Sequence, residues 1–432
     1  MEIYTTTQDK DWQTSANPTQ NEIKPTTTLD FDGSTGQTWE GFGGCFNELC
    51  GKALDNLSGS EKGKILDDLF LPGADGLNFN FCRIPVGAND YAESWYSYDE
   101  CDGDYEMNHF SIERDKKYII PLIHEAQKRN PDIQFFASPW SPPAWMKYPK
   151  AYNYGTLVWT KKNLDAYARY LLKFTEAYEN EGIHISQLHV QNEPVSSQKF
   201  PSCIWTGKQF AEFIGQYLGP LFERCKPDTK IWLGTLNGPE TDSRALYTRY
   251  NDYANLVLHD PDAYRYIEGI SYQWAGKYAV DVTRESFPEK KLIQSENECG
   301  DGENTWEYAK YVYELFRNYL TGGVCAYVYW NLALPPKGTS TWGWSQNSLI
   351  TIGPEIKYNH EYYVMKHFSE FIHPGAVRLG LKGHFTGTSA AFRNPDGQVV
   401  LVIQNPFEIP QTFDLRGKTV TLSPDSINTI VL

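Results

Sequence analysis

The sequence lacks the features of several large functional classes. No stretch approaches the roughly 18 or more apolar residues of a membrane-spanning helix. Lys and Arg number 39 against 54 Asp and Glu, and the net charge of −15 argues against nucleic acid or anionic membranes as partners, because clustered cations bind phosphate groups. HExxH, P-loop and Rossmann motifs are absent, and the nine His show no metal-ligand spacing. A metal-dependent hydrolase is therefore disfavoured.

Neither the eight cysteines nor the first residues give a clear sign of the cellular compartment. The eight Cys fit no zinc pattern, and we interpret most of them as reduced residues of the core. The N-terminus, MEIYTTTQDKDWQ, lacks the basic start and apolar centre of a secretion signal. We expect a cytoplasmic protein, or a secreted one if a signal peptide has been removed.

Aromatic residues, in contrast, are abundant. The chain has 13 Trp, 29 Tyr and 22 Phe, which is 15% of all residues. Any single Phe is best explained as a core residue. A surplus of Trp and Tyr also suits sugar binding, because the apolar C–H faces of sugars stack on aromatic rings while polar groups bond the hydroxyls.

Between residue 39 and about residue 370, apolar runs alternate with stretches of helical periodicity. Helix candidates include residues 160–182 and 302–320. The eight apolar runs cover residues 39–46, 77–87, 133–140, 185–194, 230–238, 267–276, 291–300 and 324–334. Eight strands that alternate with helices predict a (β/α)8 TIM barrel, an α/β fold that needs about 250 residues.

The two ends of the chain have a different pattern. Residues 1–38 hold extended Thr-rich segments, and short alternating runs separated by turn signals fill the C-terminal region. NPDGQ is such a turn, since Pro fixes φ and Gly accepts positive φ. We therefore predict N-terminal strands in 1–38, a catalytic barrel in 39–370 and a small β-sandwich in 371–432, which the N-terminal strands complete.

Two glutamates follow the ends of predicted barrel strands, where the active site of such barrels lies. Glu193 ends the fourth run in HVQNEP, and Glu296 ends the seventh in QSENECG. Carboxylates at these two places would face each other across the barrel mouth. Such a pair hydrolyses a glycosidic bond when one group protonates the leaving oxygen and the other attacks the anomeric carbon. A separation of about 5–5.5 Å predicts retention, and one of about 6.5–9.5 Å predicts inversion.

Neighbouring residues support this interpretation. Glu298 is an alternative to Glu296, because residues two apart on a strand point to the same face, but Glu296 is nearer the strand body and we favour it. Arg83 would keep the nucleophile ionised, and Asn192 would donate to the sugar 2-hydroxyl.

Each residue also has a plainer explanation when taken singly. A Glu at a strand end is most often a solvated rim residue, and Arg83 has even odds of forming a structural salt bridge. Trp140 and Trp330 are each more often core residues, although two Trp at separate strand ends suit a sugar subsite. The segment 195–207 is a candidate for shaping the aglycone side.

Nine stretches together carry a family resemblance. On the barrel they are GFGGCFNE, RIPVGANDY, SPWSPPAWMK, VQNEP, SEN and YWNLAL, and in the C-terminal region HPGAVRL, NPDGQVVLVIQN and LSPDSINTIVL. Over nearly the whole chain the sequence resembles glycoside hydrolase family 30, the glucosylceramidase-like family of retaining β-glycosidases. The set is highly specific, whereas GFGG or NEP alone would be weak.

The resemblance implies the barrel, a β-sandwich built from both termini, and no metal or organic cofactor. It implies Glu193 as acid/base and Glu296 as nucleophile. It further implies a sugar-binding −1 subsite made of Asp90, Trp140, Asn192 and Trp330. Asp90 stands where the family places the acidic residue that holds O3 and O4 of a glucosyl unit, which favours glucose.

One strand departs from the family pattern. The sixth strand commonly ends in a His-x-Tyr type sequence, whose Tyr contacts the nucleophile. This chain has SYQWAGK instead, so the contact with the nucleophile is expected from one of three residues, Tyr272, Gln273 or Trp274.

These observations predict a retaining, exo-acting β-glucosidase of the glucosylceramidase type that acts by double displacement. β-Xylosidase and β-1,6-glucanase are the enzyme alternatives, and a carbohydrate-binding protein with an inactive barrel is the non-enzyme alternative. The expected partner is a small-molecule, oligosaccharide or glycolipid β-glycoside, without stable membrane insertion.

Overall fold

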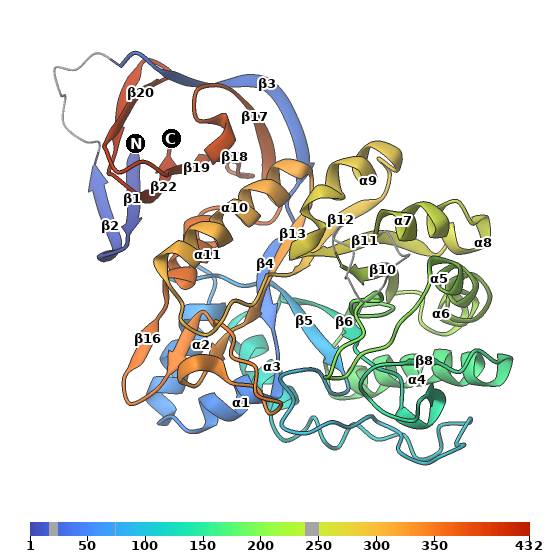
Figure 1. Ribbon diagram of the computed structural model, residues 1–432. Helices are drawn as coiled ribbons and strands as arrows, with labels where there is room; N and C mark the ends of the chain where they lie inside the picture. The colour runs from blue at the N-terminus through green and yellow to red at the C-terminus, as the bar shows by residue number, and fades with distance from the viewer. Residues whose placement is uncertain (17–24, 74, 238–249) are drawn as a thin grey trace.

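The computed structural model describes residues 1–16, 25–73, 75–237 and 250–432. Its central element is a closed barrel of eight parallel strands that follow one another in chain order, with the last pairing the first (Figure 1). The strands are β4 (Gly41–Cys45), β5 (Phe81–Val86), β6 (Gln134–Pro139), β9 (Ile185–His189), β10 (Lys230–Leu236), β11 (Ile267–Gln273), β12 (Lys291–Glu296) and β13 (Ala326–Asn331). Each lies within one of the eight apolar runs, and the predicted (β/α)8 barrel is confirmed.

Helices surround the barrel (Figure 1). They are α1 (Glu48–Asp55), α2 (Gly59–Phe70), α3 (Ile119–Arg129), α4 (Lys161–Asn180), α5 (Gly207–Phe213), α6 (Gly219–Cys225), α7 (Tyr250–Leu258), α8 (Pro261–Tyr264), α9 (Val280–Ser286), α10 (Trp306–Gly322) and α11 (His360–Ser369). The two helix candidates correspond to α4 and α10. Each begins where a Thr hydroxyl, of Thr160 or Thr305, accepts a backbone N–H of the first turn, and α10 ends at Gly323 with φ of 109°.

The barrel has separate inner and outer apolar cores. Alternate residues of the strands, among them Phe81, Phe136, Trp232, Ile293 and Val328, form a small cluster apart from the large one between strands and helices. Backbones approach closely here: a Cβ on Gly43 of β4 would lie 1.8 Å from the carbonyl oxygen of Phe81 on β5. Glycine in the GFGG motif is therefore a packing requirement of the barrel.

Both termini of the chain enter a second unit, a nine-stranded antiparallel-rich sheet folded as a β-sandwich (Figure 1). Its strands are β1 (Glu2–Thr7), β2 (Lys10–Ala16), β3 (Thr28–Thr38), β17 (Val377–Gly383), β18 (Ser389–Arg393), β19 (Val399–Asn405), β20 (Gln411–Leu415), β21 (Lys418–Leu422) and β22 (Ser426–Val431). The NPDGQ turn joins β18 to β19, with Gly397 at φ of 91°. The predicted sandwich of N- and C-terminal strands is confirmed.

Short strands order the loops that follow the barrel strands. β7 (Lys147–Tyr148) pairs β8 (Thr156–Leu157), while β14 (Ala333–Leu334), β15 (Ile350–Ile352) and β16 (Ile356–Tyr358) form a three-stranded sheet. Within the described ranges, none of the helices combines the length and apolarity needed to span a membrane.

Candidate active site

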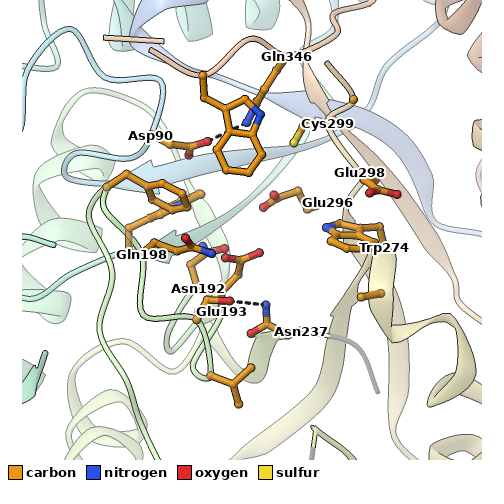
Figure 2. A pocket seen from close by; sticks show the side chains of 17 residues that line it. Asp90, Asn192, Glu193, Gln198, Asn237, Trp274, Glu296, Glu298, Cys299 and Gln346 are labelled. Carbon is orange, nitrogen blue, oxygen red and sulfur yellow. Dashed lines mark hydrogen bonds between the residues drawn. The ribbon is translucent and has the colours of Figure 1, made fainter. Parts of the chain in front are cut away.

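A cavity of about 360 Å³ opens at the carboxyl ends of the barrel strands (Figure 2). This volume lies in the range of about 300–1,000 Å³ that is usual for small-molecule sites. Six residues predicted from sequence line it: Asp90, Trp140, Asn192, Glu193, Trp274 and Glu296. Three others, Arg83, Gln273 and Trp330, lie behind this lining, and Tyr272 lies outside the barrel mouth.

Glu296 is the last residue of β12, and an irregularity in strand pairing directs it. Tyr272 of β11 pairs with Gln294, but the next residue, Gln273, pairs with Glu296, so that β12 carries one extra residue at Ser295. Such a bulge re-aims the side chain that follows it. In Figure 2 the carboxylates of Glu296 and Glu193 both point into the cavity.

Two donors bind the same oxygen of Glu296. Arg83 Nη1 lies 2.5 Å from Oε2, and Gln273 Nε2 donates to Oε2 over 2.8 Å. Burial raises the pKa of Glu296, and the charge and hydrogen bond of Arg83 oppose that rise. Because Oε2 accepts both hydrogen bonds, Oε1 is the oxygen left for chemistry.

Arg83 is fully buried, and several contacts hold its guanidinium. Ser138 Oγ accepts from Nε and Nη2 over 3.0 and 2.8 Å, and Asn192 Oδ1 accepts from Nη2 over 2.7 Å. The guanidinium carbon also lies 4.4 Å from the ring centre of Trp140. Residues from β6 and from the segment after β9 thus fix the cation that faces Glu296.

The side-chain oxygen of Asn192 is committed to the protein. It accepts hydrogen bonds from Arg83, from Gln273 over 2.7 Å and from Thr235 Oγ1 over 2.9 Å. Among the described residues, none accepts a hydrogen bond from its Nδ2. The amide therefore presents a donor to the cavity that it lines.

Glu193 lies four residues beyond the end of β9 and has an unusual backbone. Its φ is 45°, in the left-handed region that a Glu rarely adopts. Its N–H donates to Thr235 O over 2.9 Å, and its carbonyl accepts from Ser196 N over 2.9 Å. These bonds hold the residue in a strained conformation that turns its side chain into the cavity, as Figure 2 shows.

The two glutamates have different electrostatic surroundings. Burial is the largest cause that raises the pKa of Glu193 to about 8, and the charges of Glu296 and Asp90 add to it. No ion pair with a described residue holds Glu193 ionised, whereas Arg83 contacts Glu296 directly. The surroundings of Glu193 therefore favour its protonated form, while the contact with Arg83 favours the ionised form of Glu296.

Asp90 forms the opposite wall of the cavity from the loop after β5. Burial, and then the charge of Glu296, raise the pKa of Asp90 to about 7. Gln346 Nε2 donates to its Oδ2 over 3.3 Å. The other end of Gln346 accepts from Trp330 Nε1 and Asn331 Nδ2, both over 2.9 Å, so Asp90 is tied to the end of β13.

The two tryptophans have different places. Their rings lie 5.4 Å apart, tilted by 33°. Trp140 lines the cavity, while Trp330 is not among the lining residues and packs behind it. The structure therefore brings Trp140 to the surface that a sugar would meet and gives Trp330 a supporting position.

The end of β11 resolves the ambiguity among three neighbours. Gln273, inside the barrel, contacts Glu296. Tyr272 faces the helices, where its hydroxyl lies 2.6 Å from Thr283 Oγ1 of α9, because adjacent strand residues point to opposite faces. Trp274 begins the turn after the strand and lines the cavity wall. The expectation that Tyr272 contacts substrate is thus not matched by its position.

Several lining residues were not predicted from sequence. Gln346 and Trp344 come from the loop after β13, and Asn237 follows β10. The aromatic and amide-rich stretch TWGWSQNS was a signal for the first two. Within segment 195–207, four residues line the cavity: Val195, Ser196, Gln198 and Phe200. Across the described residues, no group of three or more His, Cys, Asp or Glu is arranged to hold a metal ion.

Comparison with known protein families gives two matches. Residues 39–372 match the glycosyl hydrolase family 30 TIM-barrel domain, and residues 375–430 match the family 30 beta sandwich domain. Together the two matches cover most of the chain.

Individual relatives agree with these matches. The chain is 30% identical to putative glucosylceramidase 2 of Caenorhabditis elegans, over 94% of this chain and 84% of that protein. It is 27% identical to endo-1,6-beta-D-glucanase neg1 of Aspergillus fumigatus, over 91% of this chain and 84% of that protein. The solved structure of the endo-beta1,6-glucanase BT3312 has the same fold, with a TM-score of 0.86, 24% identity, and coverage of 100% of this chain and 99% of that one.

Proposed function

The chain belongs to glycoside hydrolase family 30 and is a glycosidase, and we propose that it is a retaining, exo-acting β-glucosidase that works by double displacement. The single observation that carries this proposal is the division of roles in one cavity. Arg83 and Gln273 contact Glu296 and favour its ionised form, whereas burial and acidic neighbours favour the protonated form of Glu193. A glycosidic bond is broken by such a pair.

In the first step, Glu296 Oε1 attacks the anomeric carbon and forms a glycosyl ester. The bond from that carbon to the leaving oxygen breaks, and Glu193 transfers its proton to this oxygen. Arg83 and Gln273 keep Oε2 in place, so the attacking oxygen needs little reorientation. The raised pKa of Glu193 supports its role as the acid at neutral pH.

In the second step, water hydrolyses the glycosyl ester. Esterification removes the negative charge of Glu296, and this charge is one cause of the raised pKa of Glu193. The pKa of Glu193 therefore falls in the intermediate, and its carboxylate accepts a proton from the water that attacks the anomeric carbon. The bond between this carbon and Glu296 Oε1 breaks, and Glu296 leaves as a carboxylate. The carbon is inverted twice, so its configuration is retained.

Three side chains fit the recognition of a glucosyl unit. Asn192 Nδ2 donates to the 2-hydroxyl, a contact that strengthens in the transition state. Asp90, anchored by Gln346, accepts from the 3- and 4-hydroxyls, and Trp140 provides an apolar face for the ring. This part of the proposal favours glucose over sugars that lack or invert O4.

A second candidate activity, hydrolysis of β-1,6-linked glucan, has a specific observation in its favour. The lining beyond Glu193 mixes aromatic rings with amides: Gln198, Asn237, Trp274 and Trp344. Such a surface suits a second sugar ring as aglycone better than a lipid chain. The relative from Aspergillus fumigatus, an endo-1,6-beta-D-glucanase, supports this alternative.

The proposal is tested by following hydrolysis of a nitrophenyl β-glucoside by proton NMR. We expect β-glucose as the first product, which then mutarotates. First formation of α-glucose would overturn the double displacement. Parallel assays on the β-xyloside, the β-fucoside and a β-1,6-linked glucan rank the alternatives, and failure of all four substrates would favour a carbohydrate-binding barrel.

A further inference from the structure

A second, larger cavity lies at the opposite end of the barrel from the two glutamates, in the seam with the β-sandwich. Its volume is about 670 Å³. The barrel contributes the start of β12, the end of α10 and Arg284 of α9, and the sandwich contributes residues 35–38 of β3 and Arg378 of β17. These elements meet where the two units contact each other in Figure 1.

Cations outnumber carboxylates on the walls of this cavity. Both of its lysines form contacts with other residues of the protein. Lys291 pairs with Glu40 over 2.7 Å. Lys290 donates to the carbonyls of Tyr264 and Ile267 over 3.1 and 2.7 Å. Each lysine thus already has an acceptor in the protein, and the two arginines of the lining carry more of the remaining N–H donors, since a guanidinium has five and an ammonium three.

Arg378 is the more unusual of the two arginines in the seam. Its Nε is shielded from solvent and has no hydrogen-bond partner. No ion pair or hydrogen bond with a described residue involves its guanidinium, although a buried N–H without a partner is costly. The guanidinium of Arg284 pairs with the carboxylate of Asp281 over 2.9 Å and donates a hydrogen bond to the carbonyl of Gly322.

Glycines hold both arginines in place. A Cβ on Gly36 would lie 2.5 Å from Arg378 Nε, and a Cβ on Gly323 would lie 2.8 Å from Arg284 Cδ. Each arginine therefore packs tightly on the backbone, and Gly323 has in addition a φ of 109° that favours glycine. Burial is the largest cause that lowers the pKa of Arg378; the charge of Arg284 adds to it, and the charges of Asp32 and Asp281 oppose it.

We propose that Arg284 and Arg378 form a binding site for a small tetrahedral oxyanion, of the phosphate or sulfate class, at the seam between barrel and sandwich. Guanidinium groups bind such anions with paired N–H donors, and one anion that contacts the terminal N–H groups of both arginines would offset the repulsion between them. Because one arginine belongs to each structural unit, a bound anion would link the two and stabilise the folded chain. The site is remote from the glutamates and does not depend on the proposed glycosidase activity.

The test is a calorimetric titration of the full chain with sodium phosphate and, separately, sodium sulfate at matched ionic strength. We expect saturable binding of one anion, weakened at least about tenfold in Arg378→Gln and in Arg284→Gln, since each removes one charge-assisted contact. Arg416→Gln is the matched control, because Arg416 lies on the same sandwich with 63% of its side chain exposed and is absent from the cavity lining. The affinity of Arg416→Gln for phosphate and for sulfate should equal that of the wild type.

Thermal unfolding provides an independent measurement. Phosphate should raise the Tm of the wild type and of Arg416→Gln by more than it raises the Tm of the two cavity variants, while nitrophenyl glucoside hydrolysis stays unchanged in all four proteins. Absence of saturable binding to the wild type would overturn the site even if a variant fails to fold. Equal affinity in the wild type and the cavity variants would overturn it as well.

Discussion

Gln273 Nε2 donates a hydrogen bond of 2.8 Å to Glu296 Oε2 and a second, of 2.7 Å, to Asn192 Oδ1. One amide thus joins the proposed nucleophile to the proposed ligand of the 2-hydroxyl. The sequence left Tyr272, Gln273 and Trp274 as candidates for the contact with the nucleophile, and in the structure Gln273 makes it. A side-chain amide does not titrate over the pH range of an assay, so the donor to Glu296 is itself independent of pH.

We predict that Gln273→Leu lowers kcat/KM about 10- to 100-fold, because hydrogen bonds to a charged group contribute about 1.5–3 kcal/mol. Loss of a donor to the charged form also raises the pKa of Glu296, so the acidic limb of the pH–rate profile should move to higher pH. Tyr272→Phe is the matched control, since its hydroxyl faces Thr283 outside the barrel and should leave that limb in place. Equal shifts in both variants would contradict the assignment.

A prediction about pH follows from Glu193. Its pKa, raised to about 8, means that the acid is protonated below that pH and lost above it. We expect kcat/KM for a nitrophenyl β-glucoside to fall about tenfold per pH unit above pH ~8. In Glu193→Gln, with a dinitrophenyl glucoside that needs no acid, the burst of dinitrophenol should persist and lack this limb. A remaining limb near pH ~7 would report Asp90, whose pKa is raised to about 7.

Specificity for the 4-hydroxyl is predicted to depend on Asp90. Asp90→Ala removes an acceptor and should lower kcat/KM for the β-glucoside about 10- to 100-fold, as expected for lost hydrogen bonds to a charged group. The kcat/KM for the β-fucoside, whose O4 is inverted, should fall by a smaller factor. The ratio of the two rate constants, measured in both proteins, checks this, and a ratio unaffected by the substitution argues for a purely structural Asp90.

Much of the fold could be predicted because parallel barrel strands are buried on both faces and therefore appear as nearly continuous apolar runs. Glu193 and Glu296 could be assigned as candidates for a related reason: they end such runs, and the carboxyl ends of barrel strands meet at one mouth. Neither step required knowledge of how a side chain is turned.

Orientation and long-range contact could not be predicted in the same way. Which of Tyr272 and Gln273 faces inward depends on the register of β11, and an apolar run without alternation does not reveal it. The extra residue at Ser295, which aims Glu296, is invisible in the sequence for the same reason. Gln346 reaches Asp90 across 256 positions of chain, so only the folded structure brings them together.

Stability should respond to a carboxyl group that lies outside the cavity. Glu361 of α11 is fully buried, accepts from Asn347 Nδ2 over 2.6 Å, and has a pKa raised to about 8 by burial. The folded chain therefore keeps this proton in the range where the unfolded chain has lost it, and stability falls as pH rises from about 4.5 to about 8. In Glu361→Gln the slope should be shallower by about 1.4 kcal/mol per pH unit, measured by urea unfolding between pH ~5.5 and pH ~7.5. Exposed Glu303→Gln is the control, and the same slope as wild type in Glu361→Gln would show that this carboxyl is ionised in the folded chain.

The strongest consequence concerns Glu296 itself. Glu296→Ala leaves Arg83 buried without its counter-ion and removes the attacking Oε1, so turnover of a nitrophenyl β-glucoside should fall at least about a thousandfold. The same change opens space beside the anomeric carbon, where azide can attack in place of the carboxylate. Azide should restore part of the turnover and give the α-glucosyl azide, because a single displacement inverts the carbon. Glu298→Ala removes the neighbouring carboxylate, which also lines the cavity, and should retain most activity without azide. If the losses in the two variants were exchanged, Glu298 would be the nucleophile and the contact of Arg83 with Glu296 only structural.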